Sequence, residues 1–571
     1  MNKLFSALAF VLLITGCAGR QPDYVKLAVT TDVHGMIFPE NMITGDSTDH
    51  SLAQVQTWVG HQRAARDTAF LLMDNGDFLQ GQPSVYFFNT QRTDTPHLAA
   101  RVMNTMQYDA ATVGNHDIEA GPAVYDKLTG ELNFPWLAAN AVDEQTGEPY
   151  FEPYTVLQAG GRKIAVLGLI TPGIPDWLPK NLWPGMVFED MVITARKWVP
   201  VILREEQPDL LVGLFHAGID HTYGGSDRDT PRNENATMLV AEEVPGFDII
   251  FAGHDHRVYR DRVINREGDT VLVVDPGSHA RYTGEVLADY SGNRAEPTLR
   301  ARIIPMDTVA PSPGFLAQFA SDRREVERYL ADTVAVLTSS MHSRDGLFGP
   351  SSFVSLIHRV QMEYAEAQVS LTAPLAFNTT LEAGPLQVAD LFKLYRYENM
   401  LYAMKLTGEE VDGFLEHAVA QWFHPMDDPA DPLLLFETGQ RGRLRNPYYN
   451  FSSAAGLEYV IHLDRSPGER VEILRHSDGT PFLPTDTLRV AVNSYRGNGG
   501  GGHLTAGAGI PGEELTNRIA YASDHDMRHL LKEWLGAHDP YTPDTLTNWH
   551  FSPAHWYRQA AERDRKRLFT R

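Results

Sequence analysis

The stretch "ATVGNHDIEA", residues 111–120, begins like the end of a buried strand and then presents an amide, an imidazole and a carboxylate in succession. Its first half is small and apolar, whereas Gly114, Asn115, His116 and Asp117 follow without a break. Alone, the segment would be interpreted as a turn, because Gly, Asn and Asp are common turn residues. Whether it is more than a turn depends on how the other strands of the chain end.

Apolar, strand-like runs recur through the first half of the chain and alternate with segments of helical period. The runs are "YVKLAVTTDVHG", "AFLLMDNGD", "AATVGNHD", "KIAVLGLIT", "DLLVGLFHAG", "FDIIFAGHDH" and "TVLVVDPGS". Segments such as 51–66 and 190–206 lie between them and have helical spacing. Buried strands that alternate with helices predict a layered α/β domain, which we expect to end near Pro311.

Five of these strands end in Asp, Asn or His. The polar residues at the strand ends are Asp32, His34, Asp77, Asn115, His116, His216, His254 and His256. Ligand sites in α/β sheets form beyond the carboxyl ends of the strands, so we expect these side chains to converge. One histidine at a strand end is usually structural, but five strands that end in this way indicate a common site.

These residue types suit a pair of divalent metals. Two neighbouring metals need one shared carboxylate and several neutral ligands, and an Asp can bridge them because it has two oxygens. His and Asn add no negative charge, so the site keeps a positive field that attracts phosphate and acidifies a bound water. The strand ends therefore predict a dinuclear metal site that acts on a phosphate ester.

The composition limits the classes of function. A chain of 571 residues exceeds what one hydrophobic core usually supports, so we expect two or more domains. The hydrophobic content of 43% and the charged content of 21% are typical of an ordinary globular protein. The net charge of -24 argues against binding a nucleic-acid polymer through a basic surface. A small anionic substrate is still allowed, because a metal ion can reverse the local field.

The first residues, "MNKLFSALAFVLLITGCAGR", have the pattern of a secretion signal, with a short apolar run that suits an h-region. The sequence "ITGC" resembles a bacterial lipobox, and Cys17 is the only cysteine of the chain. The resemblance implies cleavage before Cys17 and acylation of that residue; the alternative is an ordinary signal that contains a Cys. We expect an extracytoplasmic lipoprotein, periplasmic or anchored in the outer membrane, that meets the membrane only through this lipid.

The chain changes character after "PSPG", residues 311–314. A charged helical pattern centred on "SDRREVERYL" follows and predicts a connecting helix. Helical and strand patterns then mix in a second domain, and the basic end "HWYRQAAERDRKRLFTR" is interpreted as a solvated terminal helix. The expected parts are a leader (1–17), a first domain (18–312), a linker helix (313–348), a second domain (349–540) and a basic tail (541–571).

The order D-x-H, GD, GNH, H and GH-x-H resembles the calcineurin-like metallophosphoesterases, and with its second domain the chain resembles the bacterial 5′-nucleotidase family. The resemblance implies a four-layer α/β/β/α domain, a linker helix and a second α+β domain that binds substrate. It implies one metal held by Asp32, His34, Asp77 and His256, and another held by Asp77, Asn115, His216 and His254. Asp77 would bridge the two metals, for which Zn, Mn and Co are all suitable.

The same resemblance separates His116 from the metal ligands. It implies that His116 contacts the transferring phosphate and stabilises the transition state. Many members of the family have "GNHEFD", whose last Asp orients the histidine, whereas this chain has "GNHDIE" with Glu119 at that position. We therefore expect Glu119 to orient His116, and we group Asp117 with them as catalytic. His221 and His279 are interpreted as loop residues without a catalytic role.

The second half of the chain bears on the type of ester. Nucleotidases of the 5′ type carry "NGGGIR", but the matching stretch here is "LAFNTTLEAG", residues 375–384. "DLFKLYRYENMLYAMKLTG", "YYNFSSAAGLEY", "AVNSYRGNGGGGHL" and "TPGIPDW" resemble the 2′,3′-cyclic-nucleotide 2′-phosphodiesterase/3′-nucleotidase branch. This resemblance implies hydrolysis of 2′,3′-cyclic nucleotides and 3′-nucleotides.

The resemblance also implies how a nucleotide would be held. Two rings of the second domain would sandwich the base, and Tyr449 and Tyr495 occupy the matching places, although Tyr448 is a neighbouring alternative. Arg496 and Asn378 are the further expected substrate contacts. Relatives often carry an Asp in "TGGDG" that binds ribose; this chain has Gly501 there, so its recognition of ribose must differ.

Three other functions fit parts of the sequence. A 5′-nucleotidase or nucleotide-sugar hydrolase would use the same scaffold, and a thiosulfate-ester hydrolase has a related fold. A surface lipoprotein that only binds nucleotides is the alternative without catalysis. The full set of metal ligands argues against it, because simple binding does not require them.

Overall fold

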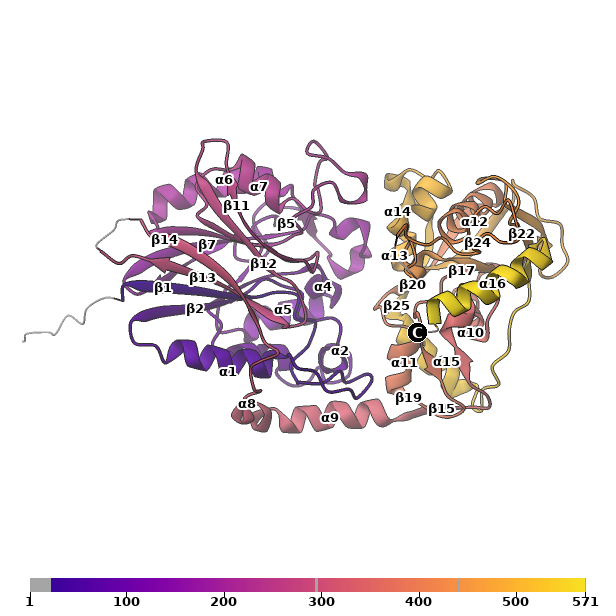
Figure 1. Ribbon diagram of the computed structural model, residues 1–571, viewed down its shortest axis with the longest axis horizontal. Helices are drawn as coiled ribbons and strands as arrows, with labels where there is room; N and C mark the ends of the chain where they lie inside the picture. The colour runs from indigo at the N-terminus through magenta and orange to yellow at the C-terminus, as the bar shows by residue number, and fades with distance from the viewer. Residues whose placement is uncertain (1–21, 293–295, 440–441, 570–571) are drawn as a thin grey trace, which may run out of the picture.

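The computed structural model describes residues 22–292, 296–439 and 442–569, and it contains two domains joined by helices (Figure 1). The predicted leader and Cys17 lie outside the described residues, so acylation stays a prediction. Within the described ranges, no helix has both the length and the apolar character needed to cross a membrane.

The first domain is built on two six-stranded, mainly parallel sheets; antiparallel strands lie at one edge of the first sheet and at both edges of the second. The first sheet has the order β14 (Thr298–Pro305), β13 (Tyr282–Asp289), β1 (Tyr24–Thr30), β2 (Thr68–Asp74), β3 (Ala110–Thr112), β4 (Trp136–Leu137). The second has the order β11 (Val258–Ile264), β12 (Thr270–Pro276), β10 (Ile249–Phe251), β9 (Leu210–His216), β7 (Arg162–Ile170), β6 (Tyr154–Ala159). Parallel strands with alternating helices are what the sequence predicted.

The two sheets pack face to face, and side-chain alternation along each strand separates an inner core from two outer ones. Val25, Leu27 and Val29 of β1 share the inner core with Ile164 and Val166 of β7. The intervening residues of β7 instead face the helices α6 (Met191–Glu206) and α7 (Thr237–Glu243). The result is helices on the outside and two sheets within.

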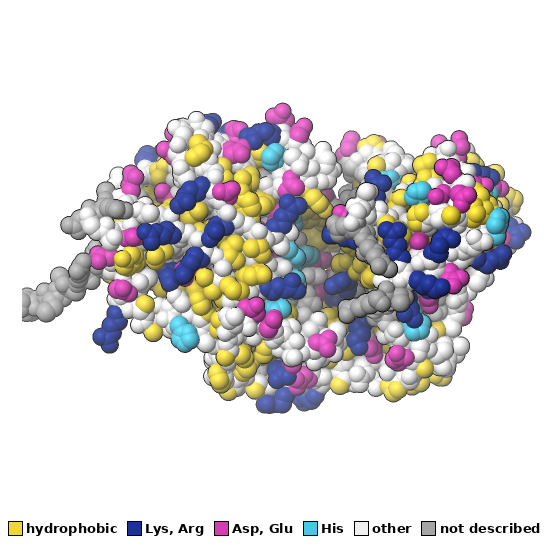
Figure 2. Space-filling model, in the orientation of Figure 1, with side chains coloured by type: hydrophobic (Ala, Val, Ile, Leu, Met, Phe, Trp, Pro, Cys, Tyr) yellow, Lys and Arg dark blue, Asp and Glu magenta, His cyan; other side chains and the backbone are white. Residues whose placement is uncertain are grey.

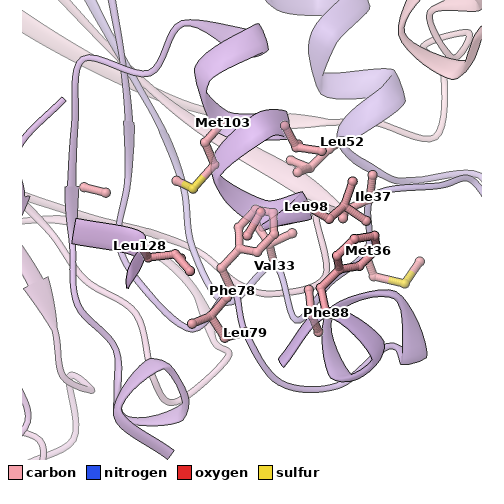
Figure 3. Packing of buried hydrophobic residues seen from close by; sticks show 14 of the residues in the cluster. Val33, Met36, Ile37, Leu52, Phe78, Leu79, Phe88, Leu98, Met103 and Leu128 are labelled. Carbon is pink, nitrogen blue, oxygen red and sulfur yellow. The ribbon is translucent and has the colours of Figure 1, made fainter. Parts of the chain in front are cut away.

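The outer face of the first sheet carries the other helical layer. Its helices are α1 (Leu52–Arg63), α2 (Pro83–Thr90), α3 (Leu98–Met106), α4 (Asn115–Glu119) and α5 (Pro122–Glu131). Figure 3 shows part of the core that they cover, with Val33, Phe78 and Leu98 in one cluster. The expected four-layer α/β/β/α arrangement is confirmed.

Two helices, α8 (Pro313–Gln318) and α9 (Ala320–Ala331), connect the domains along one side of the molecule (Figure 1). The predicted linker helix was too long, because helical structure ends at Ala331. The next segment, "TVAVL", is rich in β-branched residues and forms β15 (Thr333–Leu337), which pairs with β19 (Gly384–Gln387). The chain thus enters the second domain soon after residue 331.

The second domain is an α+β unit around a five-stranded sheet. Its order is β21 (Ser453–Ala455), β17 (Val369–Thr372), β24 (Thr487–Asn493), β20 (Met400–Thr407), β25 (Ile519–Asp526). One face packs on α10 (Ser352–Tyr364) and α15 (Met527–Ala537), and the other on α12 (Gly408–Trp422). A smaller sheet has the order β23 (Val471–His476), β22 (Leu457–His462), β26 (Trp549–Ser552).

The end of the chain is helical, as predicted, but it is not a solvated tail separate from the second domain. Strand β26 pairs with β22 in parallel register, and the helix α16 (Ala554–Phe569) buries Ala560 and Ala561 against the second domain. Asp564 of α16 accepts hydrogen bonds from the amides of Leu433 and Leu434. The charged residues of this segment hid the small apolar face through which the helix packs.

The domains also contact each other directly through α2 and α11 (Val388–Leu394). Tyr86 of α2 meets Phe392 of α11 edge to face, with ring centroids 5.3 Å apart. The guanidinium carbon of Arg528, from α15, lies 4.3 Å from both ring centroids. Arg528 also forms an ion pair of 2.9 Å with Glu398, and both side chains are almost fully buried.

Candidate active site

The strand ends of both sheets meet at one edge of the first domain. The loops after β1, β2 and β3 present Asp32 with His34, Asp77, and Asn115, and the second sheet presents His216, His254 and His256. The apolar neighbours Val33 and Phe78 are buried and anchor the first two loops (Figure 3). The polar side chains at the strand ends therefore lie together, as the sequence predicted.

Asp32, His34 and His256 form a first group of possible metal ligands. The Nε2 atoms of His34 and His256 are 2.9 Å apart, and Nε2 of His256 is 3.3 Å from a carboxylate oxygen of Asp32. Asp32 and His34 are buried, while His256 is partly exposed. Three donor atoms thus converge on one point.

A second group consists of Asp77, His216 and His254, with Asn115 among them. Nε2 of His216 lies 3.2 Å from a carboxylate oxygen of Asp77 and 3.1 Å from the amide oxygen of Asn115. The same amide oxygen is 2.8 Å from Nδ1 of His254. The two groups contain the residues that the resemblance assigned to two metals.

The backbone supports a metal-binding role. Asp32, His34, Asp77, His254 and His256 all have positive φ values, between 49° and 78°. Such conformations cost about 1–3 kcal/mol each for residues with a side chain and tend to cluster at functional sites. Hydrogen bonds between the loops, from the Asp32 amide to Gly76 and from the His34 amide to Asp77, hold them in place.

The charges of the site also fit divalent cations. Burial lowers the pKa of His34 to about 4 and that of His254 to about 3, so both imidazoles are neutral and can act as ligands. Burial alone would raise the pKa of Asp77, but His216 and His116 hold it well below its ordinary value. Asp77 in turn raises the pKa of His216 to about 9 against the effect of burial, and a cation bound by both would displace that proton.

His116 lies beside these groups without belonging to them. Its Nδ1 is 2.5 Å from a carboxylate oxygen of Glu119, and its backbone amide donates to Asp77. Burial would lower the pKa of His116, but Asp77 and Glu119 raise it to about 10, so the ring carries a proton for donation. Glu119, despite its longer side chain, reaches the ring nitrogen it was expected to orient.

Asp117 does not share this role, and its grouping as catalytic is corrected. Its carboxylate accepts hydrogen bonds from the amides of Asp77, Phe78, Leu79 and Gly114, at 2.8–3.1 Å. Both oxygens are therefore occupied by backbone groups, away from the cavity. Asp117 is a positioning residue that holds the Asp77 loop against the loop of Asn115.

A cavity of about 590 Å³ lies between the domains and includes His116, Glu119, Asn115, His254 and His256 in its wall. Figure 2 shows histidine side chains within the hollow that separates the two halves. The second domain contributes Leu375, Tyr397, Glu398, Asn399, Tyr449, Asn493, Tyr495 and Arg496 to its wall. A substrate in this cavity would touch both domains.

Tyr449, Tyr495 and Arg496 lie in the cavity wall, but Asn378 does not. Arg496 is buried, and its guanidinium donates to the carbonyl oxygens of Tyr449, at 2.9 Å, and Gly500, at 2.5 Å. It therefore links the segment of Tyr449 to that of Tyr495. Asn378 is exposed outside the cavity, and its expected contact with substrate is not supported by the structure.

Other wall residues were missed by the sequence analysis. Trp177, from "TPGIPDW", stacks on His254 with ring centroids 5.4 Å apart. Tyr223 and Glu234, from the loop region after β9, complete the wall on the side of the first domain. The sequence contains one indication of Tyr223 and Glu234: they lie in a polar, glycine-containing loop that follows a strand ending in a metal-ligand candidate. His279, interpreted as a loop residue without a catalytic role, lies outside the cavity wall, and its ring centroid is 5.2 Å from that of His34.

Comparison with known proteins agrees with this architecture. Residues 25–258 match the model of the calcineurin-like phosphoesterases, and residues 331–507 match that of the 5′-nucleotidase C-terminal domain. The protein is a calcineurin-like phosphoesterase with a 5′-nucleotidase C-terminal domain. It is thus a metallophosphoesterase that hydrolyses phosphoric esters.

Its curated relatives include a 2′,3′-cyclic-nucleotide 2′-phosphodiesterase/3′-nucleotidase of Salmonella typhimurium, 26% identical over 96% of this chain and 92% of the relative. The trifunctional nucleotide phosphoesterase YfkN of Bacillus subtilis is 26% identical over 93% of this chain, which spans 39% of that longer protein. The 5′-nucleotidase precursor of Thermus thermophilus has the same fold, with a TM-score of 0.62, 21% identity, and coverage of 92% and 99% of the two chains.

Proposed function

We propose that this metallophosphoesterase is a secreted enzyme that hydrolyses 2′,3′-cyclic nucleotides and 3′-nucleotides to nucleoside and phosphate with two divalent metals. The two groups of possible metal ligands beside His116 carry this proposal. When bound, the metals would supply a positive field that binds the phosphate and lowers the pKa of a water molecule.

The chain's own residues would bind and orient the ester. Asp77 would belong to both metal sites, with His216 and His254 on one side and Asp32, His34 and His256 on the other. His116, protonated and held by Glu119, would donate a hydrogen bond to the phosphate as negative charge develops. Tyr449 and Tyr495 would hold the base, because aromatic stacking accepts any base.

The choice of ester is supported by relatives and by the cavity. Proteins 24–26% identical to this chain, from Salmonella, Yersinia and Haemophilus, are named 2′,3′-cyclic-nucleotide 2′-phosphodiesterase/3′-nucleotidases. A cavity with metal ligands at one side and tyrosines at another suits an ester that joins phosphate to a nucleoside. The proposal also includes secretion and a lipid at Cys17, and both rest on the signal-like pattern of residues 1–20.

Hydrolysis of 5′-nucleotides is the second candidate function, because 5′-nucleotidases of Vibrio cholerae and Vibrio parahaemolyticus are 24% identical to this chain. Phosphate release from 3′-AMP, 5′-AMP and 2′,3′-cyclic AMP, with added Mn or Zn, separates the candidates. A coupled phosphatase reveals ring opening of the cyclic substrate. Faster hydrolysis of 5′-AMP would favour the second candidate, and bound metal without any phosphate release would indicate a binding protein.

A further inference from the structure

The cavity wall contains four carboxylates, three of which have partners in the protein. Glu119 pairs with His116, and Glu398 pairs with Arg528. Asp255 accepts hydrogen bonds from the backbone of Ile219, at 3.0 Å, and from that of its own loop. These three carboxylates are therefore engaged in holding the walls of the site.

Glu234 is the exception, since its carboxylate has neither a hydrogen bond nor an ion pair with any residue that the structure describes. The side chain is only partly exposed and lines the cavity. It belongs to neither group of possible metal ligands. The unpartnered carboxylate is half-buried at the cavity wall, where a hydrogen-bond donor of a ligand can reach it.

The backbone that carries Glu234 is fixed on both sides. The hydroxyl of Thr171 donates to the Glu234 carbonyl at 3.0 Å. Asn233 donates to the carbonyl oxygens of His221, at 2.8 Å, and Asp227, at 3.1 Å, and its own side-chain oxygen accepts from the amide of Asn235. The segment is thus held in place, as expected of a binding group that is positioned before its ligand arrives.

Glu234 faces the second domain across the cavity. Burial raises the pKa of the Tyr495 hydroxyl, and the nearby Tyr223 and Glu234 raise it further. Tyr223 is 59% exposed and lines the same cavity. A molecule that stacks on the ring of Tyr495 would therefore lie in the cavity that Glu234 also lines.

We propose that Glu234 determines specificity by accepting a hydrogen bond from the nucleoside part of the substrate, either a ribose hydroxyl or an exocyclic amino group of the base. This inference rests on the proposed function, in which the substrate is a nucleotide. The glycine loop at 499–502 offers no carboxylate, and Glu234 supplies one from the opposite wall. Nucleoside recognition is then shared between the two domains.

The test compares Glu234→Ala with the wild type on 3′-AMP and on bis-p-nitrophenyl phosphate, which has no ribose. The assay is run at pH 8, above the pKa of about 7 to which burial and Asp176 raise Glu234. A hydrogen bond to a charged group is worth about 1.5–3 kcal/mol, so kcat/KM for 3′-AMP should fall roughly 10- to 150-fold. The rate on bis-p-nitrophenyl phosphate should stay within about twofold. Asp229→Ala is the control, because Asp229 is an exposed carboxylate of the same loop region and does not line the cavity; it should act like the wild type.

Substrate analogues distinguish the two possible donors. The 2′-deoxy and 5′-deoxy forms of 3′-AMP each lack one ribose hydroxyl, and the 3′-phosphate of purine riboside lacks the 6-amino group. One of these losses should slow the wild type and have no further effect in Glu234→Ala. Losses that add fully for every analogue, or equal losses on 3′-AMP and bis-p-nitrophenyl phosphate, would overturn the inference. A wild type that hydrolyses no nucleotide would instead refute the proposed function.

Discussion

Replacement of Arg528 by Met should destabilise the protein strongly, because it removes one partner of a buried ion pair. The Arg528 side chain is 3% exposed and lies 2.9 Å from Glu398, whose side chain is 11% exposed. Without the guanidinium, the Glu398 carboxylate would be left buried beside the cavity with no opposite charge. The rings of Tyr86 and Phe392 would also lose the cation that lies 4.3 Å from each.

The magnitude follows from these contacts. Removing one partner of a buried ion pair costs about 3–5 kcal/mol. Two lost cation–π contacts add about 0.5–2 kcal/mol each, and sulfur–aromatic contacts of the new Met offset part of this, by about 0.3–1.5 kcal/mol. The free energy of unfolding should therefore fall by about 3–9 kcal/mol. This corresponds to a drop in Tm on the order of 10 °C for domains of this size.

Calorimetry of the wild type, Arg528→Met and the double variant with Glu398→Gln measures this effect. Because Gln carries no charge, the double variant should recover at least half of the lost stability. Arg475→Met is the control: Arg475 pairs with Glu458 at 2.7 Å, but their side chains are 54% and 32% exposed. That variant should lose less than about 1 kcal/mol. A loss below about 1 kcal/mol for Arg528→Met, or no recovery in the double variant, would refute the reasoning.

Four further predictions concern the site. Asp77→Asn should nearly abolish phosphate release and lower the metal content, whereas two bound metals and near-normal turnover would contradict its assignment. His116→Ala should retain metal and slow turnover roughly a hundredfold or more, the scale for losing a transition-state donor; loss of metal would make His116 a ligand. Tyr495→Ala should raise KM for 3′-AMP about tenfold, from about 1–3 kcal/mol of stacking, and affect bis-p-nitrophenyl phosphate much less; equal losses with a lower Tm would indicate a packing residue. Burial and Asp176 raise the pKa of Glu234 from 4.5 to about 7, so the folded state holds the proton more tightly and stability falls as pH rises through this range. Glu234→Gln should accordingly raise Tm more at pH 8 than at pH 4, and equal shifts at both pH values would contradict this account.

The metal-ligand candidates were predictable because the carboxyl ends of parallel strands meet at one edge, so the order along the chain was enough to bring Asp32, Asp77 and His216 together. Glu119 was also predictable, since it lies one turn from His116 on the same short helix. Local spacing carries such information directly.

Contacts between distant segments could not be predicted in this way. Glu234 and Tyr495 line one cavity only because the domains dock, and no periodicity in either segment indicates it. Asp117 has the chemistry of a catalytic group, but backbone amides that the sequence does not display occupy its oxygens. The charges of residues 554–569 likewise concealed the small apolar face that packs α16 against the second domain.

The metal-ligand candidates come from two different sheets. Asp32, Asp77 and Asn115 follow strands of the first sheet, whereas His216 and His254 follow strands of the second. Neither sheet alone could hold either metal with its full set of ligands. Metal loading should therefore be one of the last events in the maturation of the first domain, and once loaded the ions should act as cross-links that slow separation of the sheets. A newly folding chain would then acquire its reactive centre only after its hydrophobic interior has closed.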